Sequence, residues 1–258
     1  MHLIRPSVRV LEKIRGVEIC RLIEYSARRC YGSVDKMTLD SYKSFLKDVI
    51  MTQVITGKGH DSVLEHGKIS IEVTCDRGVS HEIVRHRLAS YSQESTRYCN
   101  YSKEKYDGQI TFIVPLWFYD AFQNQVDTIT IKIDDTIHNW VKWQETMKIA
   151  EENYQLALKK GMLPQQARNL LPNSLKTTLV MTMNIREWRH FFKMRCSSAA
   201  HPQMQEVAYA ILDILKWDKN KETGVPILFD DFDNSLYKGP WALISQKTLE
   251  EELREKNG

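Results

Sequence analysis

The most informative stretch of this chain reads Arg85-His86-Arg87-Leu88-Ala89-Ser90-Tyr91-Ser92-Gln93-Glu94-Ser95-Thr96-Arg97. Three arginines and a histidine fall within thirteen residues, among several hydroxyl groups and an amide. A buried segment does not tolerate so many cations without partners. Guanidinium groups suit phosphates, because each donates two parallel hydrogen bonds and does not lose its charge. The residues alone fit either a solvated arginine-rich loop or a site for an anionic ligand.

Length and composition are those of an ordinary globular chain. The 258 residues are 42% hydrophobic and 27% charged, which is enough to build a sizeable core. The net charge of +3 fits a small anionic ligand better than a long polyanion. No run of about 18 apolar residues occurs, and residues 1–6 lack an apolar signal core, so we expect a cytoplasmic protein without a membrane span.

The cysteines favour reduced thiols over a disulfide framework or a zinc site. There are five, an odd number, and none forms a C-x-x-C pair. A functional thiol at Cys99 or Cys196, which lie near arginine-rich segments, is left open. A zinc hydrolase is not expected, because in His81-Glu82-Ile83-Val84-Arg85-His86 the second histidine falls off the shared helical face.

Hydrophobic periodicity predicts an α+β fold. Helices are predicted over the ranges 17–30, 39–56, 134–160, 185–195 and 202–216, with a short helix opening at Pro164. A further helix from about Val79 is predicted to carry Arg85, His86 and Arg87 at its C-terminal end. Strands are predicted at 69–74, 110–114 and 175–183, and a frayed tail over 246–258. We expect a single domain over 1–258, with helices packed on a small, mostly antiparallel sheet.

Two further segments carry candidate site residues. In Gly59-His60-Asp61-Ser62-Val63-Leu64-Glu65-His66, Ser62 can donate or accept at a ligand edge, and Glu65 can orient either a neighbouring cation or the two histidines of this stretch. A polar loop that caps the following strand is the alternative. Arg168 lies among apolar and amide side chains between Leu163 and Pro172, and needs an anionic partner there. That partner is either a ligand or a structural carboxylate.

A third segment runs from Met183 to Arg195 and reads as a helix that begins near Asn184. Helical spacing places Arg186 and His190 on one face, while the aromatic side chains Trp188, Phe191 and Phe192 can pack on the other. Asn184 is also a suitable N-cap residue.

The spacing Arg85-His86-Arg87-x7-Ser95 resembles the signature of the flavin-dependent thymidylate synthases. The other three segments resemble stretches of the same family and occur in its order, so the resemblance covers about residues 55–205, with 116–135 the least matched. The Pro-Cys-His context of the classical folate-dependent thymidylate synthases is absent. The resemblance implies reductive methylation of dUMP to dTMP, with methylenetetrahydrofolate as one-carbon donor and FAD reduced by NADPH. It also implies a homotetramer with active sites where subunits meet, and no nucleic-acid or membrane partner.

The resemblance also implies site residues. Arg195 would be the catalytic group, binding the uracil ring and favouring its anionic form. The implied FAD contacts are Ser62, Arg85, His86, Arg87, Gln93, Asn184, Ile185, Arg186 and His190. The implied substrate contacts are Glu82, Ile83, Val84, Arg85, Gln93, Glu94, Ser95, Thr96, Arg97, Arg168 and Arg195. No metal is implied.

Three positions depart from the family pattern. Gln93 stands where some members have Glu, and His190 stands where others have Asn. His201 resembles another site histidine, but its interval from Arg195 is longer than in the shortest members, which leaves its role open. The alternative function is a non-catalytic nucleotide- or RNA-binding module, with Tyr91, Tyr98 and Tyr101 as stacking platforms. That alternative does not account for arginines isolated among apolar residues.

Overall fold

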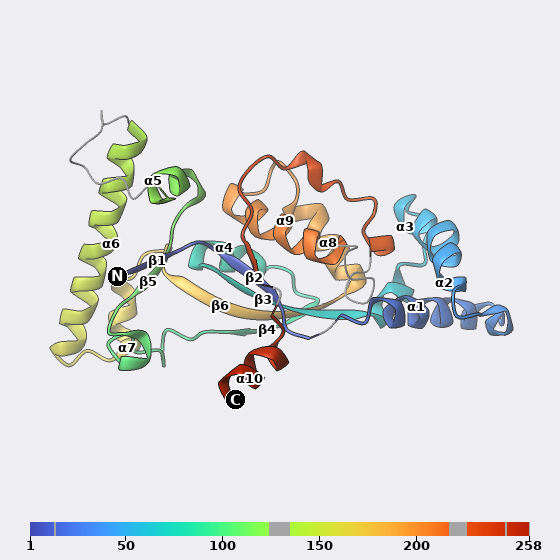
Figure 1. Ribbon diagram of the computed structural model, residues 1–258, viewed down its shortest axis with the longest axis horizontal. Coiled ribbons are helices and arrows are strands. Elements are labelled where there is room, and N and C mark those ends of the chain that lie inside the picture. Colours follow the sequence, from blue (N-terminus) through green and yellow to red (C-terminus); the bar gives the residue numbers. More distant parts are fainter. Residues whose placement is uncertain (13, 124–134, 217–225, 246, 258) are drawn as a thin grey trace. The chain divides into compact units, whose positions relative to one another are not determined.

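The computed structural model describes residues 1–12, 14–123, 135–216, 226–245 and 247–257. Helices and strands are mixed in the α+β manner, as predicted (Figure 1). Five strands form one sheet in the order β4-β6-β3-β2-β7, and two form a second sheet, β1-β5. Their bounds are β1 His2–Ile4, β2 Ser7–Val10, β3 Lys68–Asp76, β4 Ala89–Gln93, β5 Thr111–Ile113, β6 Lys176–Asn184 and β7 Leu243–Ser245.

The strand pairs run in both senses. β1 pairs in parallel with β5, and β2 in parallel with β7. β3 and β6 run in opposite directions, as two contacts between side-chain hydroxyls show. The hydroxyl of Ser70 lies 2.8 Å from that of Thr182, and four residues further along β3 the hydroxyl of Thr74 lies 3.0 Å from that of Thr178. The sheet therefore contains parallel as well as antiparallel pairs.

β3 and β6 follow the alternation that predicted them. Along β3 the side chains of Ile69, Ile71 and Val73 are buried, and the polar side chains between them are half-buried. β6 shows the same period-two pattern, with Leu179 and Met181 among its buried side chains. Apolar side chains on one face of each strand thus supply core contacts, while the other face carries the hydroxyl pairs.

The chain divides into two compact units. Unit 1 comprises Met1–Pro6, Thr74–Ile83 and Gln93–Leu179; unit 2 comprises Ser7–Val73, Val84–Ser92 and Val180–Gly258. The expectation of a single domain over 1–258 stays a prediction.

Unit 1 is organised by a long helix, α6 (Asp135–Lys159), together with α4 (Arg77–Ile83), α5 (Tyr119–Gln123) and α7 (Pro164–Ala167) (Figure 1). Tyr154 of α6 and Phe112 of β5 belong to one buried cluster. Trp140 of α6 belongs to a second cluster and stacks on Trp143 with ring centroids 5.5 Å apart. These aromatic contacts hold α6 within the unit. Residue 134, the predicted start of this helix, lies outside the described residues.

Unit 2 contains the other α-helices of the described residues. Their bounds are α1 Gly16–Cys30, α2 Ser41–Ser44, α3 Thr52–Ile55, α8 Ile185–Arg195, α9 Pro202–Lys216 and α10 Leu249–Asn257. A π-helical segment, Phe45–Met51, joins α2 to α3, so the predicted helix over 39–56 is continuous but locally widened. Within α8, Trp188 and Phe192 are fully buried and stack at 5.8 Å.

Two predictions of secondary structure are wrong. α4 ends at Ile83 and does not carry Arg85–Arg87; these three residues lie in the segment that leads to β4, a strand that was not predicted. The hydroxyl of Tyr91 donates to the carbonyl of His86 at 2.7 Å, which holds this backbone outside a helix. The expected frayed tail instead forms α10, although residues 246 and 258 lie outside the described part.

Ion pairs between side chains stabilise α10. The high content of charged residues predicted a frayed tail, because composition alone does not show that these charges can pair along a helix. Glu250 pairs with Arg254, and Glu252 pairs with Lys256, each one helical turn apart. Glu252 also pairs with Arg9 of β2, whose other terminal nitrogen lies 2.7 Å from Glu72 of β3. Among the described residues, no helix is long and apolar enough to cross a lipid bilayer.

Candidate active site

Unit 1 contains a pocket of about 250 Å³ with a cationic and polar wall. Arg77 and His81 reach it from α4, Thr96 from the turn after β4, and Arg168 from the 3-10 turn Arg168–Leu170. Two guanidinium groups, an imidazole and a hydroxyl can all donate hydrogen bonds to one small anion. The pocket is therefore chemically suited to a phosphate or carboxylate group.

The local sequence explains how Arg168 is presented. Pro164 opens α7, where the side chain of Gln166 accepts from the backbone N–H of Leu163 at 2.9 Å. Buried Ala167 anchors the turn, and the side chain of Arg168 that follows is exposed. Within the described part of the chain, no carboxylate pairs with Arg168, so the structural ion pair considered above is not found there.

Gln93 and Glu94 are held by neighbouring side chains of unit 1. The amide nitrogen of Gln93 donates to Ser80 at 3.0 Å and to Thr177 at 3.1 Å. Glu94 accepts from the ammonium group of Lys176 at 2.9 Å. These contacts fix the end of β4 against β6 and so set the position of the following turn. Of the next three residues Thr96 lines the pocket, whereas Ser95 and Arg97 do not.

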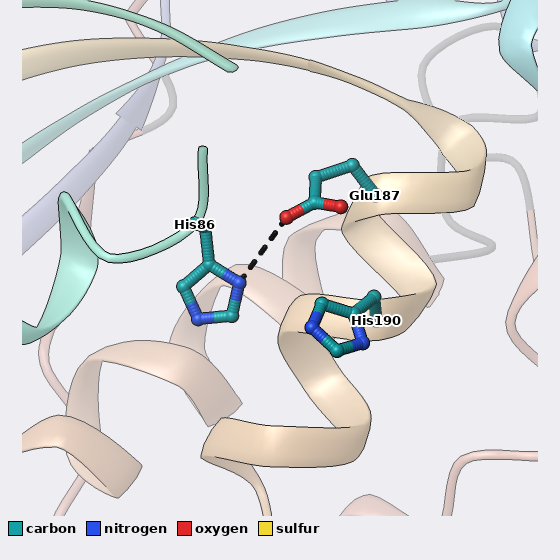
Figure 2. A group of neighbouring side chains, drawn as sticks. All are labelled: His86, Glu187 and His190. Carbon is teal, nitrogen blue, oxygen red and sulfur yellow. Dashed lines mark ion pairs between the residues drawn. The ribbon is translucent and has the colours of Figure 1, made fainter. Parts of the chain in front are cut away.

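Unit 2 holds a cluster of three side chains in which His86 and Glu187 are buried and His190 is exposed (Figure 2). His86 lies on the segment before β4, and Glu187 and His190 lie on α8, so helix periodicity brings the last two toward the same imidazole. The residues His86 and Glu187 are each 5% exposed. Nε of Arg195, at the end of α8, donates to Nε2 of His86 at 3.1 Å.

Burial shifts the pKa values of His86 and Glu187 toward their neutral forms. Desolvation, then the charges of Arg195 and His190, lower the pKa of His86 to about 4, so the imidazole is neutral at pH 7. Its Nδ1 lies 3.3 Å from a carboxylate oxygen of Glu187, yet the geometry leaves that buried atom without a hydrogen bond. The contact is consequently a close polar approach and not an ion pair. Desolvation also raises the pKa of Glu187.

The first turn of α8 presents another polar group. The side chain of Asn184 accepts from the backbone N–H of Glu187 at 2.8 Å and so acts as the N-cap. Arg186 is exposed and bonds to Glu65 at 2.7 Å, which confirms the expectation that Glu65 orients a neighbouring cation. Ser62 is exposed in the same 3-10 segment as Glu65, Asp61–His66.

The other predicted site residues are placed as follows. Ile83 and Ile185 are fully buried, so their side chains are core groups and a ligand could meet only their backbone. Val84, Arg85 and Arg87 are exposed, and Glu82 is half-buried. His201 is exposed at the start of α9, where its Nδ1 accepts from the backbone N–H of Gln203 at 3.3 Å. Burial raises the pKa of Cys196 to about 12, which argues against a reactive thiolate at that position.

The prediction from sequence missed three residues of these sites. Arg77 is not among the site residues predicted from the sequence, and His81 enters the sequence analysis only as a rejected metal ligand. Both fall in the first two turns of α4, at i and i+4, which puts them on one helix face. Glu187 was missed because an acidic residue in the first turn of a helix usually marks an exposed, dipole-stabilised position.

An α+β chain with a cationic pocket in one unit, and a buried histidine bonded to a half-buried arginine in the other, has the groups expected of an enzyme for a phosphate-bearing ligand. The chain belongs to the family described as thymidylate synthase complementing protein, whose profile matches residues 15–217.

Curated relatives agree with this membership. The flavin-dependent thymidylate synthase of Pyrococcus abyssi is 31% identical over 198 residues, which are 72% of this chain and 74% of the relative. That of Corynebacterium aurimucosum is 31% identical over 219 residues, 82% and 79% of the two chains. That of Geobacter sulfurreducens is 30% identical over 226 residues, 84% of each.

Proposed function

We propose that this chain is a flavin-dependent thymidylate synthase, a methyltransferase that converts dUMP to dTMP. The observation that carries the proposal is the pocket around Arg168, a cationic site of suitable size for a phosphate group in a chain of this family. Methylenetetrahydrofolate is the proposed one-carbon donor, and NADPH the reductant of the flavin. The alternative, a non-catalytic nucleotide- or RNA-binding module, gains no support from the family.

The nucleotide phosphate is proposed to bind in the unit 1 pocket. Arg168 and Arg77 supply charge, and Thr96 supplies a hydroxyl donor. Ser95 and Arg97 belong to the same turn and complete the nucleotide contacts in this proposal, as does Glu82 of α4. Ser95 is assigned a positioning role, because its hydroxyl oxygen accepts from the backbone N–H of Arg97 at 3.3 Å and no protein nucleophile is needed.

Several side chains of unit 2 carry hydrogen-bond donors that suit the groups of FAD. Arg85 and Arg87 are exposed guanidinium groups, and Arg186 and His190 are exposed on α8. A diphosphate carries charge that such groups can neutralise, and Ser62 and Asn184 can donate to neutral edges of a ring or ribitol. When bound, FAD supplies the redox chemistry of the reaction.

Arg195 performs the electrostatic part of the proposed reaction. Methylation at C5 of uracil requires an electron-rich ring, and a guanidinium group beside the imide favours the anionic form of that ring. Burial of the neighbouring His86 keeps that imidazole neutral, so no second cation competes at this position.

The active unit is proposed to be a cytoplasmic homotetramer with active sites between subunits. Many cationic side chains are assigned to one ligand pair, among them Arg85, Arg87, Arg168 and Arg195. Their mutual repulsion depends on the distances between them and not on which chain carries them, so the phosphates of FAD and dUMP are the groups that would offset it. The arrangement between subunits is the one that the family resemblance implies.

The test is spectroscopic and catalytic. The purified protein should be yellow with bound flavin, and should convert dUMP to dTMP when given methylenetetrahydrofolate and NADPH. Omission of either co-substrate should stop the reaction. A colourless protein that binds no added FAD and forms no dTMP would show that the proposed function is wrong.

A further inference from the structure

Three side chains of unit 2 form a continuous polar chain from the first turn of α8 to the end of the same helix. Glu187 faces Nδ1 of His86 at 3.3 Å (Figure 2). Nε2 of His86 accepts from Nε of Arg195 at 3.1 Å. His86 and Glu187 are each only 5% exposed, so water has little access to the contact between these two residues. The imidazole ring is further confined by Phe191, with ring centroids 5.0 Å apart.

The contact with Arg195 determines which nitrogen of His86 carries the proton. A guanidinium Nε–H is always a donor, so Nε2 of His86 must offer its lone pair. A neutral imidazole has one N–H, which is therefore on Nδ1, the atom that faces Glu187. A carboxylate oxygen of Glu187 is an acceptor 3.3 Å from that atom, close enough to favour this tautomer although the contact falls short of hydrogen-bond geometry.

His86 and Glu187, together with His190, could be mistaken for a metal site. Ligand atoms of His86, Glu187 and His190 all lie within 4.8 Å of one another. A metal ion would need the lone pair of Nδ1, which would move the proton to Nε2. Nε2–H would then oppose the N–H of Arg195, and the metal charge would add to that of the guanidinium. The geometry thus favours a proton on Nδ1 over a metal.

We propose that Glu187 is a positioning residue for Arg195 and acts through His86. Glu187 selects the Nδ1–H tautomer, the tautomer presents a lone pair at Nε2, and that lone pair fixes the plane of the Arg195 guanidinium. This inference rests on the proposed function, in which Arg195 contacts the uracil ring. It adds a residue that neither the signature stretch nor the assigned ligand contacts include.

The first measurement reads the tautomer directly. In ¹⁵N-histidine NMR spectra of the flavin-containing enzyme, the His86 signals, assigned by their loss in His86→Gln, should show a protonated Nδ1 and an unprotonated Nε2. Glu187→Gln retains an oxygen acceptor and should keep this tautomer, whereas Glu187→Leu should shift the population toward Nε2–H. Glu206→Leu, at another glutamate that is 1% exposed, is the control for loss of a buried carboxyl group and should leave the His86 tautomer unchanged.

The second measurement asks whether Glu187 acts only through Arg195. Glu187→Leu should lower kcat for dTMP formation by about 10- to 100-fold, and Glu187→Gln by much less. In an Arg195→Ala background, Glu187→Leu should cause no further loss, because the group it positions is gone. Equal losses in both backgrounds would overturn the proposal, as would a wild-type enzyme with Nε2–H.

Two other outcomes are informative. Stoichiometric Zn²⁺ binding to the purified enzyme that disappears in His190→Gln would replace the positioning role by a metal site. If the wild-type enzyme forms no dTMP while His86 shows the expected tautomer, the proposed function fails and the tautomer argument stands. The two failures are thereby separated.

Discussion

Arg195 is the residue on which the proposed chemistry depends most directly. Arg195→Ala should lower the rate of dTMP formation by about 10² to 10³, because it removes one electrostatic group from the reacting ring. Flavin content and the free energy of unfolding should change little. Lys193→Ala, also in the last turn of α8, is the matched control and should retain activity. An Arg195→Ala rate within a few-fold of wild type would refute the assignment.

His86 gives the protein a pH-dependent stability. Its pKa is about 4 in the folded chain and ordinarily 6.5, so between these values the unfolded chain binds a proton that the folded chain does not. The free energy of unfolding should therefore fall as pH drops through this window, by about 3 kcal/mol at most. Urea unfolding of the wild type and of His86→Gln, compared at pH 7 and pH 4.5, measures this contribution.

The neighbours of His86 change the pH dependence of the free energy of unfolding in opposite directions. The charges of Arg195 and His190 contribute to its low pKa, whereas Glu187 has a raised pKa and gains stability on protonation. Only the difference between wild type and His86→Gln isolates the histidine. A difference that does not change between the two pH values would show that His86 titrates normally in the folded protein.

At the scale of the element, α8 depends on its N-cap. Asn184→Ala should lower the free energy of unfolding by about 1 kcal/mol, because the N–H of Glu187 loses its side-chain acceptor. Asn184→Asp keeps an acceptor and should retain stability. Flavin affinity then separates the two roles of this position: if the Asn184→Asp variant binds FAD as well as the wild type does, the amide N–H₂ makes no important flavin contact.

α10 offers a second test at this scale. The pKa of Glu252 is lowered to about 2 by its hydrogen bonds to Lys256 and Arg9, so these contacts persist at neutral pH and are lost only as pH falls toward 2. Glu252→Gln should speed hydrogen exchange over Leu249–Asn257 and leave dTMP formation unchanged. Glu250→Gln, which disturbs only a pair with Arg254 within the helix, should have a smaller effect.

Hydrophobic periodicity predicted the helices and strands that are long enough to show a clear pattern in their own sequence. The helix predicted over 185–195 is α8, and the strand predicted at 69–74 lies within β3. The short strands β1, β2 and β7 were missed, since three or four residues carry too little pattern and their partners are distant in sequence. The burial of Glu187 was equally invisible, because it follows from a contact with His86 that no local pattern encodes.

At the scale of the whole molecule, the assigned ligand contacts are split between two units. Arg168 and the pocket proposed to hold the phosphate belong to unit 1, whereas Arg195 and the exposed arginines Arg85 and Arg87 belong to unit 2. His86 bonds to Arg195, which links the signature stretch to the catalytic candidate within one chain. Arg168 and Arg195 are therefore the informative pair for asking whether one active site draws on two subunits.

Complementation between variants answers that question. Arg168→Ala and Arg195→Ala should each be nearly inactive alone. If each site takes Arg168 from one subunit and Arg195 from another, random mixing of two chains per site leaves about a quarter of the sites with both groups intact. Activity should then rise after subunit exchange in equal mixtures, and the double variant mixed with either single variant is the control that should stay inactive. Mixed oligomers seen by native mass spectrometry without recovered activity would show that both arginines serve a site from the same chain, and an active monomer would exclude the shared site altogether.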